Sequence, residues 1–439
     1  MLQNLRISGF AGEILPVNPK GGTMFGLAAR KSLRELPAPA DLVVIVIRPD
    51  LILDAVREAA ATGHRHLLIL PGGFAEAGEA GKARDRELRA LIAQHGLAVV
   101  GPNCAGIIHL PEGARFAATF LRDMPPGPNQ RGSLAFVTQS GALGEEAIAA
   151  AHALNIPLGT LVSVGNAVQL GVADYLQYLG ADPAISAVLL YIESIEDKAR
   201  FKAMARQVAA VKPVVALIGG RTAPGARAAA AHTGASAEDD AAMEAFAGDC
   251  GMLRVTSLRR LLLAAKGFGT FPEGIGRRVL VLSNSGGPGV LCTDRAAAEG
   301  LELVPLPAAM AARLRAALPA EAAVANPLDL LADAREDRFG LTLEAAIGEG
   351  GAFDAILGIH VVPFMVEAGP VIQRLAQLAP QVPVPFFHSM MGTLPGKAAW
   401  FASIEAAGVP TFNDVEAMAE CAGLLARYPA LRARARGGS

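Results

Sequence analysis

The feature that most constrains this chain is a series of short, unbroken runs of apolar residues. Runs of this length without alternation are what a parallel strand buried on both faces requires. The segments between them are alanine-rich, amphipathic and long enough for crossover helices, so the pattern predicts repeated βαβ units in an α/β fold with open, largely parallel sheets. The runs occupy residues 42–47, 66–70, 97–100, 133–137, 160–163, 187–192, 213–218, 278–282, 355–359 and 382–386.

Two segments rich in proline and glycine, residues 124–132 and 267–276, interrupt this pattern and predict linkers. With 439 residues, and roughly 150 residues per domain, the chain is long enough for three domains. We therefore expect open-sheet domains at 1–127, 128–272 and 273–439. The second and third begin alike, with a strand, a Ser-Gly loop and a helix, which suggests a repeated module.

Composition excludes several classes of function. Charged residues make up 18% of the chain and the net charge is −2, with no block of like charges for a nucleic acid or a membrane surface. The four cysteines are scattered, without a CxxC or a cysteine–histidine cluster, so neither disulfides nor a metal site is predicted. No apolar run approaches the ~20 residues that span a bilayer, and no signal peptide is evident, so we expect a cytoplasmic protein.

The loop after residues 133–137 has the sequence of an anion-binding helix start. Ser140 can cap the following helix, while Gly141 and Ala142 let an anion approach the backbone closely. The free N–H groups and the positive end of the helix favour a phosphate there. An ordinary capped turn between a strand and a helix is the alternative interpretation.

A second loop of the same kind follows residues 278–282. Ser285, Gly286 and Gly287 allow a tight turn and close backbone approach, and Pro288 fits a first helical turn. The alternative is again a tight structural turn. Because ligands of open α/β sheets bind at the carboxyl ends of the strands, both loops are candidate phosphate sites.

Two side chains are candidates for chemistry beside these loops. Glu193 follows the run at 187–192, and a strand-end carboxylate can orient an imidazole ring and support charge on it. His232 lies in a segment of small residues after the run at 213–218, where we expect a loop that a large anionic group can approach. A histidine beside two phosphate loops suggests a phosphohistidine, whereas without that context it would be a loop residue with no role.

The first domain carries Pro- and Gly-rich loops after successive predicted strands, which together form a shallow cleft for an extended cofactor. In this interpretation Phe74 and Pro102 could flank a flat base. Among the remaining histidines, His388 follows a predicted strand and is the one to note. The candidate cofactor-binding residues are Lys20, Arg48, Pro49, Gly72, Gly73, Pro102 and Asn103.

Taken together, these motifs resemble the NDP-forming acyl-CoA synthetases, the superfamily of succinyl-CoA synthetase and ADP-forming acetyl-CoA synthetase. The resemblance covers essentially the whole chain. It depends on Val17-Asn-Pro-Lys20, Gly101-Pro-Asn-Cys104, Gln139-Ser-Gly-Ala-Leu-Gly144, Tyr191-Ile-Glu193, Ala231-His-Thr-Gly-Ala235, Asn284-Ser-Gly-Gly-Pro-Gly289 and Asn326-Pro-Leu-Asp329.

The resemblance implies a Rossmann-like CoA-binding domain followed by two flavodoxin-like ligase domains. His232 would match the histidine that the family phosphorylates, and Glu193 the glutamate that orients it. The loops at Ser140 and Gly286 would match two helix N-termini facing the phosphate across the site. The implied reaction converts an acid, CoA and a nucleoside triphosphate into acyl-CoA, the nucleoside diphosphate and phosphate, through an acyl phosphate.

Three departures from the family accompany the resemblance. Relatives usually open with a strand and a Gly-Ala-Ser loop that holds CoA phosphates, and this chain starts after that point. We therefore expect a misplaced start, a truncation or impaired CoA binding. No ATP-grasp domain is found, which implies a separate subunit for the nucleotide and Mg²⁺, and an oligomer. Asn166-Ala-Val-Gln-Leu170 lacks the acidic residue that relatives often carry after the asparagine.

The sequence thus predicts the CoA-binding, phosphohistidine-bearing chain of an acid–thiol ligase. A non-catalytic CoA or acyl-CoA sensor, or a truncated pseudoenzyme, is the rival interpretation. An NAD-dependent oxidoreductase is disfavoured because no GxGxxG follows a strand with an acidic residue about 20 positions later. The acyl substrate and the choice between ATP and GTP are left open.

Overall fold

The computed structural model describes residues 1–233, 239–392 and 394–437, with the backbone alone at residues 230–233. The chain divides into two compact units, residues 1–262 with 432–439 and residues 263–431. Both units are built from helices and largely parallel sheets, which confirms the predicted α/β class. The domain bounds 1–127, 128–272 and 273–439 stay a prediction.

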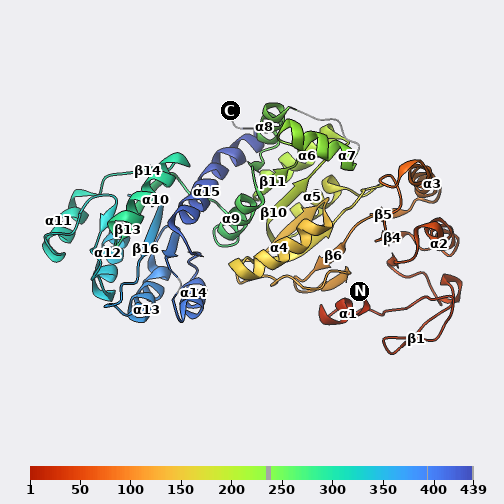
Figure 1. Ribbon diagram of the computed structural model, residues 1–439, viewed down its shortest axis with the longest axis horizontal. Helices are drawn as coiled ribbons and strands as arrows, with labels where there is room; N and C mark the ends of the chain where they lie inside the picture. The colour runs from red at the N-terminus through yellow and green to blue at the C-terminus, as the bar shows by residue number, and fades with distance from the viewer. Residues whose placement is uncertain (234–238, 393, 438–439) are drawn as a thin grey trace. The chain divides into compact units, whose positions relative to one another are not determined.

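The first unit begins with a short parallel sheet of order β3-β4-β5, flanked by helices (Figure 1). Pro49 opens the second helix, where its missing N–H costs nothing, and Gly96 ends the third in the left-handed conformation. The elements are α1 (Leu2–Ile7), β1 (Thr23–Met24), β2 (Leu27–Ala28), η1 (Leu33–Glu35), β3 (Val43–Ile45), α2 (Pro49–Ala61), β4 (His66–Ile69), α3 (Gly78–His95) and β5 (Ala98–Val100).

The same unit contains a seven-stranded sheet of order β12-β11-β10-β8-β9-β6-β7. Its first five strands run parallel, whereas β6 and β7 extend it in antiparallel fashion. The elements are β6 (Gly106–His109), β7 (Phe116–Thr119), β8 (Ser133–Thr138), α4 (Gly141–Leu154), β9 (Leu158–Ser163), α5 (Val172–Ala181), β10 (Ile185–Ile192), α6 (Lys198–Ala209), β11 (Val214–Ile218), α7 (Ala223–Thr233), α8 (Asp240–Asp249) and β12 (Leu253–Val255). Helix α9 (Leu258–Phe268) begins in this unit and ends in the second.

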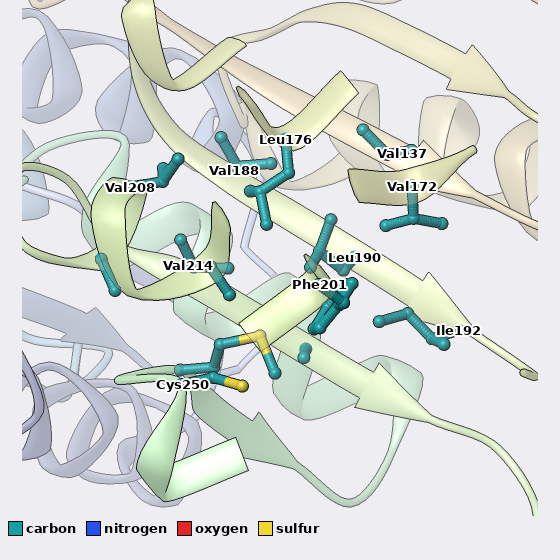
Figure 2. Packing of buried hydrophobic residues seen from close by; sticks show 14 of the residues in the cluster. Val137, Val172, Leu176, Val188, Leu190, Ile192, Phe201, Val208, Val214 and Cys250 are labelled. Carbon is teal, nitrogen blue, oxygen red and sulfur yellow. The ribbon is translucent and has the colours of Figure 1, made fainter. Parts of the chain in front are cut away.

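A cluster of buried apolar side chains fixes the position of the central strands of this sheet. Figure 2 shows Leu190 and Ile192 of β10 together with Val214 of β11 and Phe201 of α6. Full burial of one such side chain contributes about 1.5–3 kcal/mol relative to exposure. The strand ends that carry the candidate site are therefore held on a rigid scaffold.

The second unit is built on a six-stranded parallel sheet of order β14-β13-β16-β17-β18, with β15 pairing β13. The long C-terminal helix begins in this unit. The elements are β13 (Arg278–Ser283), α10 (Gly286–Ala298), β14 (Glu302–Leu303), α11 (Ala308–Ala317), β15 (Leu328–Asp329), α12 (Glu336–Gly348), β16 (Ala355–His360), α13 (Ala368–Leu378), η2 (Ala379–Gln381), β17 (Phe386–Met390), α14 (Lys397–Ala406), β18 (Thr411–Phe412) and α15 (Val415–Ala435).

One predicted strand is displaced in the structure. The run at 382–386 precedes β17, which begins at Phe386, because Pro383 and Pro385 have no N–H to donate to a neighbouring strand. His388 consequently lies inside β17 and is buried, and the expectation that it follows a strand is wrong.

Candidate active site and cofactor-binding loops

The Ser140 loop joins β8 to α4 and is closed by a hydroxyl clamp. The buried Thr138 hydroxyl donates to the Ser140 carbonyl at 2.8 Å and accepts from the Ser140 N–H at 2.9 Å. Ser140 is the N-cap of α4, and its Oγ accepts from the Leu143 N–H at 3.5 Å. The helix thus starts at Gly141 in a fixed orientation, with the N–H groups of its first turn at the carboxyl edge of the sheet.

The Ser285 loop joins β13 to α10 and has the same clamp. The Ser283 hydroxyl donates to the Ser285 carbonyl at 2.8 Å and accepts from the Ser285 N–H at 3.0 Å. A Cβ placed on Gly287 would meet nothing within 4 Å, so the start of α10 is open to a ligand. Two loops of different sequence therefore share one local structure, which supports the repeated module suggested by the sequence. This loop belongs to the second compact unit.

A side-chain amide ties each loop to the end of the neighbouring strand. Gln139 Oε1 accepts from the N–H groups of Glu193 at 2.5 Å and Ser194 at 3.0 Å, and its Nε2 donates to the Ser194 carbonyl at 3.0 Å. In the second unit, Asn284 Nδ2 donates to the Val361 carbonyl at 2.8 Å and Oδ1 accepts from the Val361 N–H at 2.8 Å. The amide is thus part of the repeated loop structure.

Glu193 follows β10 directly, at the strand end where the sequence predicts it. Its carboxylate accepts a hydrogen bond from the Tyr191 hydroxyl. Burial, together with the charge of Glu193 and this bond, raises the pKa of Tyr191 to about 12. A tyrosine is a protonated donor at neutral pH, so Glu193 is held by its own strand as well as by Gln139.

His232 lies in the last turn of α7, not in a loop as the sequence analysis expected. The run of alanines before it explains the difference, because alanine has the highest helix propensity of all residues. The side chain of His232 and all of residues 234–238 lie outside the described structure. Its phosphorylation therefore stays a prediction.

Four of the predicted cofactor-binding residues come together at the carboxyl ends of β3, β4 and β5. Pro49 opens α2, and a Cβ added to Gly73, whose φ is +99°, would come within 2.6 Å of the Pro49 Cβ. A Cβ on Gly72 would come within 3.0 Å of Asn103 Oδ1. The positive φ and the close approach to the proline ring require glycine at position 73, whereas at position 72 a Cβ would meet only the ends of flexible side chains. These loops form one contiguous surface.

The other predicted cofactor residues differ in their exposure to solvent, since Arg48 and Lys20 are exposed and Pro102 is buried. The Arg48 side chain is 75% exposed and pairs with Asp50 at 2.9 Å. Lys20 is exposed between α1 and β1, where its N–H donates to Asn18 Oδ1. Pro102 follows a cis peptide bond and is buried.

Phe74 is fully buried and belongs to the apolar core around β4. The expectation that it flanks a flat base is therefore wrong. The strand-end pattern marks where a residue lies along the chain but does not say whether its side chain points into the core.

A polar network connects the cofactor loops to the longer sheet, and two of its members, Glu76 and Asn166, are not among the predicted site residues. Glu76 accepts from the N–H groups of Gly73 and Phe74 and from Asn166 Nδ2, while Asn166 Oδ1 accepts from Asn103 Nδ2 at 3.2 Å. Burial raises the pKa of Glu76, but the donated hydrogen bonds outweigh it and the pKa is lowered. The carboxylate thus stays charged. The strand-end rule applied to β9 would have identified Asn166.

The first unit contains a pocket of about 620 Å³, which lies between the cofactor loops and the strand end that carries Glu193. Asn103, Asn166 and Glu76 line one part of it, and Gln139, Glu193 and Arg200 line another. Arg200 is ion-paired with Asp174. The pocket therefore joins the cofactor loops to the loop that carries Glu193.

The part of the chain that the structure describes contains neither a membrane-spanning helix nor a cluster of metal ligands. Within residues 1–233, 239–392 and 394–437, no helix combines the length and apolar character needed to cross a membrane. The same residues contain no group of three or more His, Cys, Asp or Glu side chains placed to hold a metal ion.

Family models match two segments of the chain. The model described as a CoA binding domain matches residues 1–110, and the succinyl-CoA ligase like flavodoxin domain matches residues 131–268. The first segment and residues 131–262 of the second lie in the first compact unit, where the cofactor loops and Glu193 are found.

Similar proteins are found over nearly the whole chain. The acetate–CoA ligase (ADP-forming) II subunit alpha of Pyrococcus furiosus is 34% identical over 94% of this chain and 89% of its own length. The acetate–CoA ligase (ADP-forming) I of Archaeoglobus fulgidus is 32% identical over 82% of this chain, which spans 51% of that relative. The solved acetyl-coenzyme A synthetase 1 of Ca. Korarchaeum cryptofilum, in complex with phosphate and ADP, superposes with a TM-score of 0.91 at 28% identity, over 99% of this chain and 93% of that one.

Proposed function

This chain belongs to the ADP-forming acyl-CoA ligases, and from that membership we propose that it is the chain that binds CoA and carries the phosphohistidine. The proposed reaction starts when a nucleoside triphosphate transfers its terminal phosphoryl group to His232. The phosphoryl group then passes to a carboxylic acid, and CoA displaces phosphate from the acyl phosphate. The relatives are named as ligases, which favours this enzyme over a non-catalytic CoA sensor or a pseudoenzyme.

The observation that carries the proposal is the pair of matching loops at Ser140 and Ser285. Each is clamped by a hydroxyl on the preceding strand, and each opens a helix with a glycine. A phosphoryl group in transfer carries its charge on peripheral oxygens, and preorganised N–H groups stabilise that charge without donating a proton. We assign the phosphate-binding role to Ser140–Ala142 and Ser285–Gly287.

The pocket next to Glu193 suits the step that forms the thioester. CoA would lie along Pro49, Gly72, Gly73 and Asn103, with its thiol reaching the pocket. The acyl phosphate would meet it from the side of Gln139 and Glu193. Placing the two reactants in one pocket converts a bimolecular attack into an oriented one, which is a large source of rate enhancement.

The nucleotide step requires a second protein in this proposal. The Pyrococcus furiosus relatives are named alpha subunits, and this chain spans 89% of one of them. We propose an ATP-grasp subunit that binds the nucleotide and Mg²⁺ and loads His232. The acid belongs to the class of carboxylic acids that such relatives are named for, acetate and 4-hydroxybutyrate among them.

Labelling with acetyl phosphate tests the proposed phosphohistidine. The purified chain, incubated with acetyl phosphate labelled in the phosphoryl group, should take up label that is stable to base and labile to acid. The His232→Ala variant should take up none under the same conditions. Label that persists in His232→Ala would contradict the assignment.

Reconstitution tests the proposed partner. The chain alone should show exchange between acyl phosphate and CoA at best, and ATP-dependent acyl-CoA formation should require an added ATP-grasp subunit. Turnover of ATP, acid and CoA by the chain alone, lost in His232→Ala, would show that it contains its own nucleotide site.

A further inference from the structure

We propose that Gln139 and Tyr191 are positioning residues that together hold Glu193 for the phosphorylation of His232. The inference rests on the proposed function, since it takes Glu193 to be the group that orients the histidine. It adds the two side chains that fix the glutamate: Gln139 through the backbone and Tyr191 through the carboxylate.

Gln139 fixes the peptide backbone on both sides of Glu193. One amide oxygen accepts from two consecutive N–H groups, at 2.5 Å and 3.0 Å, and the amide nitrogen donates to the carbonyl that follows. These bonds use both ends of the side chain and allow one orientation of the loop. Because Gln139 itself lies between Thr138 and Ser140 of the clamped loop, the backbone of Glu193 is tied to the phosphate loop.

Tyr191 fixes the other end of the same residue. Its hydroxyl donates to the Glu193 carboxylate, and a tyrosine keeps its proton at neutral pH even at its ordinary pKa of about 10. The hydroxyl oxygen also lies 3.4 Å from the place where a Cβ on Gly219 would be. Gly219 follows β11, and the chain then continues into α7, which carries His232. The Tyr191 hydroxyl thus lies beside the residue that follows β11, the strand that precedes α7.

The second unit shows what the amide contributes without a glutamate. Asn284 makes the corresponding pair of bonds, but to the backbone of Val361, an apolar residue. The amide link is therefore a general way of joining two strand ends in this fold. In the first unit, the position it holds carries a carboxylate, and a tyrosine is added to orient that carboxylate.

The step affected is transfer of the phosphoryl group from acyl phosphate to His232. One imidazole nitrogen forms a bond to phosphorus while the bond from phosphorus to the acyl oxygen breaks, and the acid leaves as a carboxylate. The other ring nitrogen keeps its proton, and the positive charge that develops on the ring is stabilised by Glu193. A glutamate that moves freely would provide less of this stabilisation, because the bond must be in place before the charge develops.

Gln139→Met keeps length and volume but removes the amide, and Tyr191→Phe removes the hydroxyl alone. Each variant is made in the wild-type chain and in a Glu193→Gln background. Single-turnover labelling of the chain by acetyl phosphate is measured over a range of concentrations, so that the maximal rate and the half-saturating concentration are separated. The matched controls are Gln207→Met on α6 and Tyr178→Phe on α5, both exposed side chains outside the site.

Each site variant should lower the maximal labelling rate by on the order of 10-fold, with little change in the half-saturating concentration, while the controls leave both unchanged. In the Glu193→Gln background, the same changes should cost less than about 2-fold, because residues that act through one group are not additive. Equal losses in both backgrounds, or no loss in the single variants, would overturn the inference. A wild-type chain that takes up no label would instead refute the proposed function.

Discussion

Acidification should destabilise the second unit through two buried histidines. His360 on β16 and His388 on β17 lie in its core, with their ring centroids 6.2 Å apart. Within the described residues, none of their four ring nitrogens has a hydrogen-bond partner. Burial lowers the pKa of His360 to about 4. Burial, with the nearby charges of His360 and Lys397, lowers that of His388 to about 3.

The sign and size of the effect follow from these values. Both histidines are neutral in the folded unit throughout pH 5–8, whereas in the unfolded chain they gain protons below their ordinary pKa of 6.5. The contribution of the two neutral histidines to the free energy of unfolding is therefore fully present above pH 6.5. It is lost as the pH falls from 6.5 toward 4. At pH 5, about 1.5 pH units below the ordinary value, each histidine costs about 2 kcal/mol at 1.36 kcal/mol per unit, or about 4 kcal/mol for the pair.

Tryptophan fluorescence can follow this unit by itself. Trp400, the one tryptophan in the sequence, packs against the core of the second unit. Urea unfolding monitored by this signal at pH 7.5 and pH 5 should show a free energy of unfolding lower by about 4 kcal/mol at pH 5. His360 and His388 are also the only histidines between residues 263 and 431, so no other imidazole of this unit contributes.

The double variant His360→Leu/His388→Leu provides the control. Replacing unpartnered buried nitrogens with apolar groups of similar size should leave stability at pH 7.5 equal or higher. It should also remove most of the difference between pH 7.5 and pH 5. An unchanged pH dependence in the double variant, or a wild-type stability that does not change between these two pH values, would refute the reasoning.

Three further predictions concern the first unit. Thr138→Val should lower the free energy of unfolding by about 1–3 kcal/mol and weaken labelling by acetyl phosphate, because it removes both clamp bonds to Ser140. Gly165→Ala should destabilise more strongly than Gly22→Ala, since both have positive φ but a Cβ at Gly165 comes within 2.3 Å of a carbonyl oxygen; equal melting temperatures would contradict this. Lys212→Met should cost about 1–3 kcal/mol in urea unfolding, because its ammonium donates to three backbone carbonyls.

The parts of the fold that sequence predicts well are those fixed by local pattern. The apolar runs at 66–70, 133–137 and 278–282 correspond to β4, β8 and β13, because a strand buried on both faces is apolar through its middle, with polar residues only at its ends. The helix starts at Ser140 and Ser285 are also visible, since a serine followed by glycine suits an N-cap position and a tight turn. In the described structure the Ser140 hydroxyl makes the cap hydrogen bond, whereas the Ser285 side chain makes none.

The remainder depends on tertiary contacts that leave little local signal. Strands β6 and β7 have four residues each and are defined by antiparallel pairing with β9 and with each other. The role of Gln139 becomes visible when Glu193 is brought next to it, 54 residues later in the chain. A strand-end pattern likewise places Phe74 in the right loop but does not reveal that its ring is buried.

The antiparallel pairing of β6 with β9 limits how this protein can be cut and recombined. A fragment that ends at residue 110, where the match to the CoA binding domain ends, would separate β6 from its partner strand β9, in which Leu161 lies opposite Ile108. The remaining chain would then expose the edge of β9, and unpaired edges of this kind promote aggregation. Chimeras between relatives should therefore keep residues 106–119 with the seven-stranded sheet and exchange the cofactor loops upstream of Gly106.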